Sequence, residues 1–183
     1  MKLRNWILAT WMGWALGIVL TVAAAFGFEG LGAGGMQTPV GVGMGAGVGL
    51  MQSRRLKDIV PRPRLWIWAS GAGLGIPFAI WDAVRRTGFE SAYSLYVLVA
   101  AGGMLAGCWQ AFFLKDAGVS NWAWMAASGA GWLLASASVA AADWMPRALG
   151  IRGLAGAGIF LGMALIGGAV LGLVTGYALK SNV

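Results

Sequence analysis

The chain consists of long apolar stretches separated by short polar segments. Six apolar stretches follow one another, with approximate bounds 6–28, 34–51, 65–81, 92–114, 122–142 and 153–179. A hydrocarbon core about 30 Å thick needs about 20 helical residues, and the second and third stretches reach that length only with flanking residues or in a thinner bilayer. Because no stretch keeps the strict period of two that a membrane β-barrel requires, the pattern predicts an all-α membrane protein with six transmembrane helices.

The composition supports a membrane protein and argues against catalysis. Hydrophobic residues make up 59% of the chain and charged residues 10%, whereas soluble domains carry about 25% charged residues. Cys108 is the single cysteine and histidine is absent, which removes the usual proton shuttle and the commonest metal ligand. The six acidic residues fall in loops or at predicted helix ends. We therefore expect no enzymatic activity, no catalytic residues and no metal site.

The basic residues predict the orientation in the membrane. With the N-terminus inside, the cytoplasmic segments hold nine of the 13 Lys and Arg residues and two of the six acidic residues, and the other side holds four of each. This distribution follows the positive-inside rule. We therefore expect a multi-pass protein of the bacterial inner membrane with both termini in the cytoplasm. The formal charge of +7 then has a topological cause, and no nucleic-acid partner is expected.

The first apolar stretch also has features of a signal peptide. Lys2 and Arg4 precede it, but the apolar run is about twice as long as the usual core of 7–15 residues. We expect a retained helix.

A motif of two glycines, one polar residue and a Leu-Lys pair occurs three times. The copies are Gly45-x3-Gly49-x2-Gln52-x3-Leu56-Lys57, Gly103-x3-Gly107-x2-Gln110-x3-Leu114-Lys115 and Gly168-x3-Gly172-x2-Thr175-x3-Leu179-Lys180, at shifts of 58 and 65 residues. The segment at 66–74 also matches 124–132 at a shift of 58, and the same shift backward pairs Gly71 with Gly13. These repeats predict one transmembrane domain over 1–183, built from hairpins at about 1–58, 59–116 and 117–183. Such parallel repeats should be related by a pseudo-threefold axis along the membrane normal.

The repeated glycines are typical of close helix packing in membranes. Small residues let helix backbones approach where no hydrophobic force drives association. We expect Gly45, Gly49, Gly103, Gly107, Gly168 and Gly172 to form helix contacts of the glycine-zipper type, and Gly158 and Gly162 to add another packing face. An alternative is that the glycines make room for a flat ring or a polyene, such as a quinone, a carotenoid or a chlorin. Membrane lipid is a further candidate contact, and no cofactor is required by the sequence.

Polar and aromatic residues supply the remaining candidates for a site. Gln52, Gln110 and Thr175 each precede a lysine by five residues and would form one polar layer, either as interhelical hydrogen bonds or as a constriction. Tryptophans at the helix starts, among them Trp6, Trp66 and Trp124, suit an interfacial aromatic belt. Four tryptophans lie deeper and are candidate contacts for a partner or a ligand, with at least two of them projecting outward: Trp11, Trp14, Trp109 and Trp132.

These features favour a non-catalytic accessory subunit of a larger membrane complex. The predicted helix interiors carry no charge, the loops are short, and no site chemistry is evident. A photosynthetic or respiratory assembly is the natural host, with other membrane subunits as partners. The alternative is a transporter or channel component that captures a small solute. A polar cavity in the bundle would favour transport, and a bundle filled by side chains would favour the subunit.

Overall fold

The computed structural model describes residues 2–89 and 94–180, and these residues form a bundle without strands. Its elements are α1 (Leu3–Gly30), α2 (Thr38–Ser53), α3 (Pro63–Arg85), α4 (Ser94–Leu114), the short 3-10 helix η1 (Lys115–Ala117), α5 (Asn121–Ala148) and α6 (Gly153–Lys180). Five of the six α-helices, all except α2, are long and apolar enough to cross a membrane. The structure confirms an all-α chain with six helices and supports a multi-pass membrane protein.

The second helix is shorter than its apolar stretch indicates. The sequence predicts a helix from residue 34, but α2 begins at Thr38 and has 16 residues, which is about 24 Å. Gly32 and Gly35, in the preceding connection, have φ angles of 73° and 77°. Glycine adopts this left-handed conformation readily, and it does not continue a right-handed helix. The structure therefore has six helices, five of which are long and apolar enough to span a membrane, and α2 is the short one. The expected start of the fourth helix at residue 92 lies outside the described residues.

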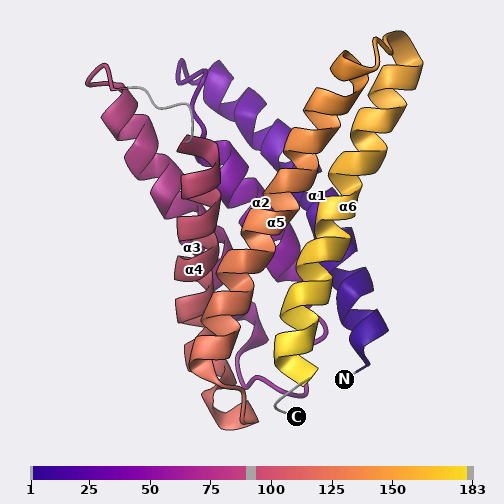
Figure 1. The fold of residues 1–183 in the computed structure, drawn as a ribbon. Coiled ribbons are helices and arrows are strands. Elements are labelled where there is room, and N and C mark those ends of the chain that lie inside the picture. The colour runs from indigo at the N-terminus through magenta and orange to yellow at the C-terminus, as the bar shows by residue number, and fades with distance from the viewer. Residues whose placement is uncertain (1, 90–93, 181–183) are drawn as a thin grey trace.

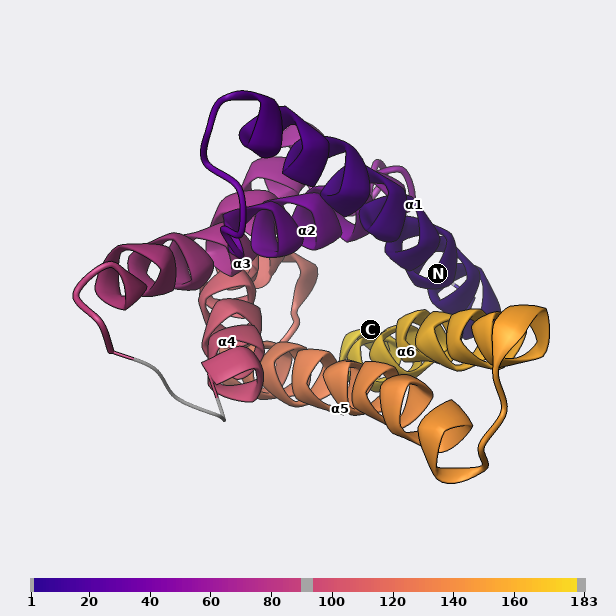
Figure 2. The same cartoon turned by 90° about the horizontal axis from the view of Figure 1, so that it is seen from above.

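The six helices form a closed ring. Each helix packs against its neighbours in the chain, and α6 packs against α1 to complete the circle. Figure 2 shows this ring from above, with α1 and α2 on one side, α3 and α4 on the second, and α5 and α6 on the third. Figure 1 shows that both ends of the chain lie at one end of the bundle and that the helices spread apart toward the other. We call these the terminal end and the hairpin end.

Asp82 holds the start of α2 against the last turn of α3. One carboxylate oxygen accepts a hydrogen bond from the Gln37 amide (2.8 Å), and the other accepts bonds from the Thr38 amide (2.7 Å) and hydroxyl (2.6 Å). The side chain is buried. The first amides of a helix have no partner within the helix, and an anion is favourable at that end of the helix dipole. This carboxylate therefore compensates for the early start of the short helix.

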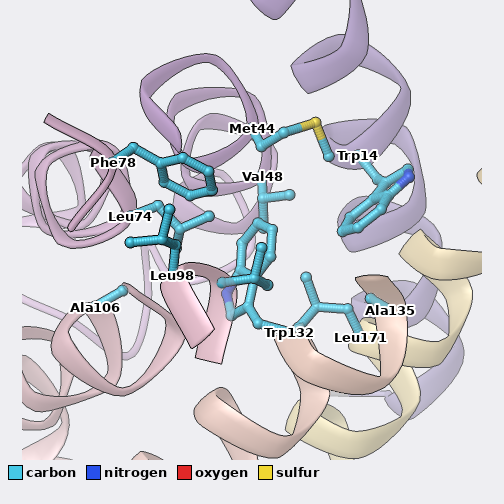
Figure 3. Packing of buried hydrophobic residues seen from close by; sticks show 11 residues of the cluster. Trp14, Met44, Val48, Leu74, Phe78, Leu98, Ala106, Trp132, Ala135 and Leu171 are labelled. Carbon is cyan, nitrogen blue, oxygen red and sulfur yellow. The ribbon is translucent and has the colours of Figure 1, made fainter. Parts of the chain in front are cut away.

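Buried hydrophobic residues form two clusters, one in the middle of the ring and one at the terminal end. The middle cluster includes Trp14, Leu74 and Trp132, and Figure 3 shows these side chains meeting inside the ring. The terminal cluster contains Trp6, Trp66 and Trp124, together with leucines and valines from the helix ends and from the links after α2 and α4. Hydrophobic side chains thus meet inside the ring at two levels.

Candidate functional site

The six predicted packing glycines lie at the three interfaces where an even-numbered helix meets the next odd-numbered helix around the ring. A Cβ added to Gly49 on α2 would lie 2.7 Å from the Cβ of Ser70 on α3, and one added to Gly107 on α4 would lie 2.8 Å from the Cβ of Ser128 on α5. Gly172 on α6 approaches Thr10 on α1, at 3.1 Å. Larger side chains could not fit here without moving a helix.

The other three glycines of the motif lie in the same interfaces, one turn closer to the hairpin end. A Cβ at Gly45 would overlap the carbonyl oxygen of Ser70, and Cβ atoms at Gly103 and Gly168 would lie 2.8 Å and 2.5 Å from the Cβ atoms of Trp132 and Trp14. Gly158 and Gly162 differ, because a Cβ at either position would have no neighbour within 4 Å. The expected packing face at these two glycines is therefore wrong, since this side of α6 faces away from the neighbouring helices.

A buried layer of hydrogen bonds connects the helices between the two hydrophobic clusters. The indole of Trp66 donates to Gln52 (3.0 Å), and the Gln52 amide donates to Thr10 (3.1 Å). In the same way Trp124 donates to Gln110 (3.1 Å), and Gln110 donates to Ser70 (2.8 Å). We call this network the tryptophan–glutamine layer. It crosses from α1 through α2, α3 and α4 to α5.

The layer closes around the ring through Thr175, with a different geometry. Trp6 on α1 donates to the Thr175 hydroxyl on α6 (3.0 Å), and that hydroxyl donates to the Leu171 carbonyl (2.7 Å). Ser128 occupies the place that Ser70 and Thr10 have in the other two parts of the layer, but it donates to the Gly103 carbonyl (2.7 Å). A threonine is too short to bridge from tryptophan to the next hydroxyl as glutamine does. The α5–α6 pair is therefore joined by packing at this level, without a side-chain bridge.

The sequence predicted only Gln52, Gln110 and Thr175 as members of this layer, and it missed the tryptophans and hydroxyls that they meet. The sequence placed Trp6, Trp66 and Trp124 in an interfacial belt, but these residues are at most 1% exposed. Each indole N–H donates a hydrogen bond to a buried acceptor inside the ring. The hydroxyl partners were not singled out at all. A signal for both was present, since Trp-x3-Thr or Trp-x3-Ser occurs at residues 6–10, 66–70 and 124–128. This spacing places the two side chains on one face of a helix.

An apolar cavity of about 260 Å³ occupies the centre of the ring on the hairpin side of this layer. All six helices contribute to its wall. The main lining residues are Trp14, Ile18, Val40, Met44, Leu74, Phe78, Leu95, Val99, Trp132, Ser136, Val139, Phe160 and Ala164. Leu95 and Phe160 each keep 41% of their surface exposed, so the cavity reaches the surface of the bundle. Toward the terminal end its wall is formed by the buried Trp14 and Trp132.

Trp14 and Trp132 lie side by side at the closed end of this central cavity. Their ring centroids are 5.6 Å apart with the planes tilted by 35°, a favourable distance for an aromatic pair. The Trp14 indole also donates to the Ala164 carbonyl (2.9 Å). Both tryptophans are at least 95% buried. They are therefore not on an outward partner surface, because cavity and helix contacts enclose them.

The other two deep tryptophans are closer to the outside. Trp11 is 38% exposed, and Trp109 is half-buried. Each keeps part of its surface exposed, so the expectation that at least two deep tryptophans project outward rests on these two alone. The four candidates thus divide into a cavity pair, Trp14 and Trp132, and a peripheral pair.

The wall of the central cavity is almost entirely apolar. No ionisable side chain lines it, and its polar side chains are Thr21 and Ser136. The Ser136 hydroxyl already donates to the Leu133 carbonyl (2.7 Å). Within residues 2–89 and 94–180, no three His, Cys, Asp or Glu side chains are grouped as a metal site would require. The cavity can accept apolar groups and excludes charge.

No protein-family model, no curated protein and no solved structure matches the chain.

Proposed function

We propose that this chain is a non-catalytic integral membrane protein that holds a small apolar molecule in the central cavity of a three-hairpin ring. The observation that carries the proposal is the cavity itself, which is lined by all six helices and closed at one end by a tryptophan pair. Binding sites are typically apolar hollows with few polar groups between the helices of a bundle. The hydrogen-bonded layer beneath would keep the ring rigid around the ligand.

Corresponding contacts support the pseudo-threefold arrangement of the hairpins. A Cβ at Gly13 would approach Val48, one at Gly73 would approach Ala106, and one at Gly131 would approach Leu171. Val48, Ala106 and Leu171 are related by the shifts of 58 and 65 residues found in the glycine motif. The same contacts pair Gly13 with Gly73, at a shift of 60. For α1 and α3 these contacts favour a shift of 60 over the pairing of Gly13 with Gly71, while α2 and α4 keep the shift of 58.

The size and chemistry of the cavity restrict the ligand. Pockets for drug-sized molecules measure about 300–1,000 Å³, so a volume near 260 Å³ suits one or two fused rings or a short chain. A quinone ring or the end of a polyene is compatible with this space, and a whole chlorin is too large. Solutes with a net charge are excluded, because burying an unpaired charge is very costly.

The cavity is compatible with both functions expected from the sequence, the accessory subunit and the transporter component. A membrane protein that takes an apolar molecule from the bilayer can deliver it, as a capture subunit of a transporter does, or keep it as a cofactor inside a larger assembly. The buried tryptophan pair and the tryptophan–glutamine layer lie on the terminal side of the cavity, which disfavours an open channel. We propose the accessory role in the inner membrane, with both termini cytoplasmic and Trp11 and Trp109 available to neighbouring subunits. Copurification of defined partners from native membranes would test this role.

Cavity-filling variants test the binding proposal. Protein in lipid nanodiscs is titrated with 1-aminoanthracene, and emission sensitised by tryptophan is recorded. We expect saturable binding to the wild type and its loss in Ser136→Phe and Val99→Phe, since both residues line the cavity from different helices. Leu134→Phe is the matched control, because Leu134 lies on α5 but is 52% exposed. Equal saturable signals in all four proteins would contradict the proposal.

A further inference from the structure

The largest group of basic residues in the chain lies where α2 passes into α3, at the terminal end. Residues 54–64, which we call the basic corner, contain five exposed basic residues: Arg54, Arg55, Lys57, Arg62 and Arg64. The acidic residues in the links at this end are Asp58 and Asp116. Together they could neutralise at most two of the five cations, so the basic corner keeps an excess of positive charge.

The basic corner is anchored to the bundle although most of it lies outside the helices. Leu56 and Val60 are buried in the terminal cluster. The amides of Ile59 and Val60 both donate to the Leu56 carbonyl, at 3.0 Å and 2.8 Å. The apolar side chains of the link therefore hold it against the helices, while its basic side chains remain exposed.

The sequence repeat contains a matched corner without this charge. At the shift of 58 residues, 56–58 and 114–116 have the same sequence, Leu-Lys-Asp. The four arginines have neutral counterparts at that shift, which are Phe112, Phe113, Ser120 and Trp122. The positive-inside rule requires an excess of basic residues on one side of the membrane, and it does not require them at one corner. Orientation alone therefore does not account for the basic corner.

Trp68 indicates the level of the basic corner relative to the bilayer. It lies four residues after Arg64 on α3, on the same face of the helix, and both side chains are exposed. Exposed tryptophans of membrane proteins are enriched at the level of the lipid headgroups. Arg64 is one turn nearer the helix start, so its guanidinium lies among the headgroups, where lipid phosphates are the available anions.

We infer that the basic corner binds anionic phospholipid. The headgroup would lie beside Arg62 and Arg64, and the first acyl carbons would lie against the exposed Leu65 and Trp68. Basic residues close to a membrane surface attract anionic lipid. A lipid fits better than an acidic protein, because these cations border the hydrocarbon region through Leu65 and Trp68. This inference does not depend on a ligand in the central cavity, whose lining includes no residue of the basic corner.

Native mass spectrometry of the full-length protein tests the inference. Detergent-purified protein is offered equal amounts of phosphatidylglycerol and phosphatidylcholine, and we expect the wild type to retain phosphatidylglycerol in preference. Arg62→Gln/Arg64→Gln should lower this preference about 25-fold, because each basic residue contributes about fivefold, the factor that corresponds to about 1 kcal/mol. Arg85→Gln/Arg86→Gln is the matched control and should keep the preference, since these exposed arginines share residues 82–90 with two acidic residues.

Two further variants separate the loss of charge from damage to the fold. Arg54→Gln/Arg55→Gln removes the same charge without altering α3 and should show a similar loss, whereas Arg62→Lys/Arg64→Lys keeps the charge and should keep the preference. Near-UV circular dichroism would show that each variant is folded.

Three results would overturn the inference. Equal retention of both phospholipids by the wild type would exclude an anionic-lipid site and favour an acidic protein at the basic corner. Equal losses in the glutamine variants of the basic corner and of the Arg85 and Arg86 control would show that the preference follows the total charge of the protein. A loss in the folded lysine variant as large as in Arg62→Gln/Arg64→Gln would show that positive charge at this corner does not determine binding.

Discussion

At the residue scale, the buried glutamines are the most informative side chains. Gln52 and Gln110 each accept a hydrogen bond from an indole and donate one to a hydroxyl, so each amide connects three helices. In hydrocarbon an unpaired polar group has no water to replace a lost partner. The hydrogen bonds of the layer together fix the relative positions of the helices, which no single bond in the layer could do.

Replacing Gln110 with Leu should destabilise the bundle by about 1–3 kcal/mol, because the Trp124 indole and the Ser70 hydroxyl lose their partner in a buried place. Thr175→Val should cost less, since Thr175 receives one hydrogen bond from another helix, from Trp6. Unfolding titrations in detergent with increasing dodecyl sulfate would measure both effects. A Gln110→Leu protein as stable as the wild type would show that the layer contributes little.

The sequence could predict which residues are polar and buried but not which partners they meet. The spacing of Gln52, Gln110 and Thr175 indicated a common level in the bundle, and their burial agrees with it. The Trp-x3-Thr spacing places Trp6 and Thr10 on one helix face, but it does not say whether that face turns inward, because an indole near a helix start suits either an interfacial belt or an interior acceptor. That choice depends on α6 closing against α1, a contact between the first and last helices of the chain.

At the element scale, α2 depends on its neighbours more than the other helices do. It is short, rich in glycine, and held at its start by Asp82. The hydrophobic pattern indicated a helix here, but the start was four residues early, because apolar and glycine residues continue into the connection from α1. Glycine disfavours a helix in isolation, so packing and the Asp82 contact maintain this element.

Removing the carboxylate in Asp82→Ala should loosen the first turn of α2, since two backbone amides and one hydroxyl lose their acceptor. We expect a loss of about 1–3 kcal/mol in stability and faster hydrogen exchange at residues 37–41. Asp143→Ala is the matched control, because the Asp143 pair with Arg147 is exposed. Unchanged exchange at the start of α2 would contradict the role given to Asp82.

Glycine substitutions test the close approach of α2 and α3. Gly49→Leu should destabilise the bundle by about 1–3 kcal/mol through overpacking, because its Cβ would lie 2.7 Å from that of Ser70. Gly162→Leu should be tolerated, since no atom lies within 4 Å of a Cβ there. Thermal unfolding in detergent would compare the two variants. Equal losses would show that helix propensity or lipid contact, not packing at the interface, determines the effect.

At the scale of the whole molecule, the ring has two different ends. The helices spread apart toward the hairpin end and are closer together at the terminal end (Figure 1). The apolar cavity lies on the hairpin side, and most of the basic residues lie at the terminal end. Repeats in the sequence predicted three hairpins but gave no indication of a cavity. Whether a cavity forms depends on the sizes of the side chains that meet inside the ring. Trp14, Leu74 and Trp132 leave a space there, and the periodicity of the sequence does not predict it.

The charge distribution predicts that the terminal end faces the cytoplasm. In a Cys108→Ser background, Gly34→Cys in the connection between α1 and α2 should react with a membrane-impermeant maleimide in spheroplasts, and Lys57→Cys should react only after lysis. Both positions are exposed in the structure. The reverse labelling pattern would invert the proposed topology.

The most direct test of the central claim is ¹⁹F NMR of protein labelled with 5-fluorotryptophan during titration with naphthalene. Trp14→Phe and Trp132→Phe would assign the two cavity resonances. We predict that these two resonances shift and saturate, because both rings line the cavity. The resonances of Trp68 and Trp122, which are 75% and 78% exposed, should not follow the same saturation curve. Shifts that are linear and similar for all tryptophans, or none at Trp14 and Trp132, would contradict a ligand site inside the ring.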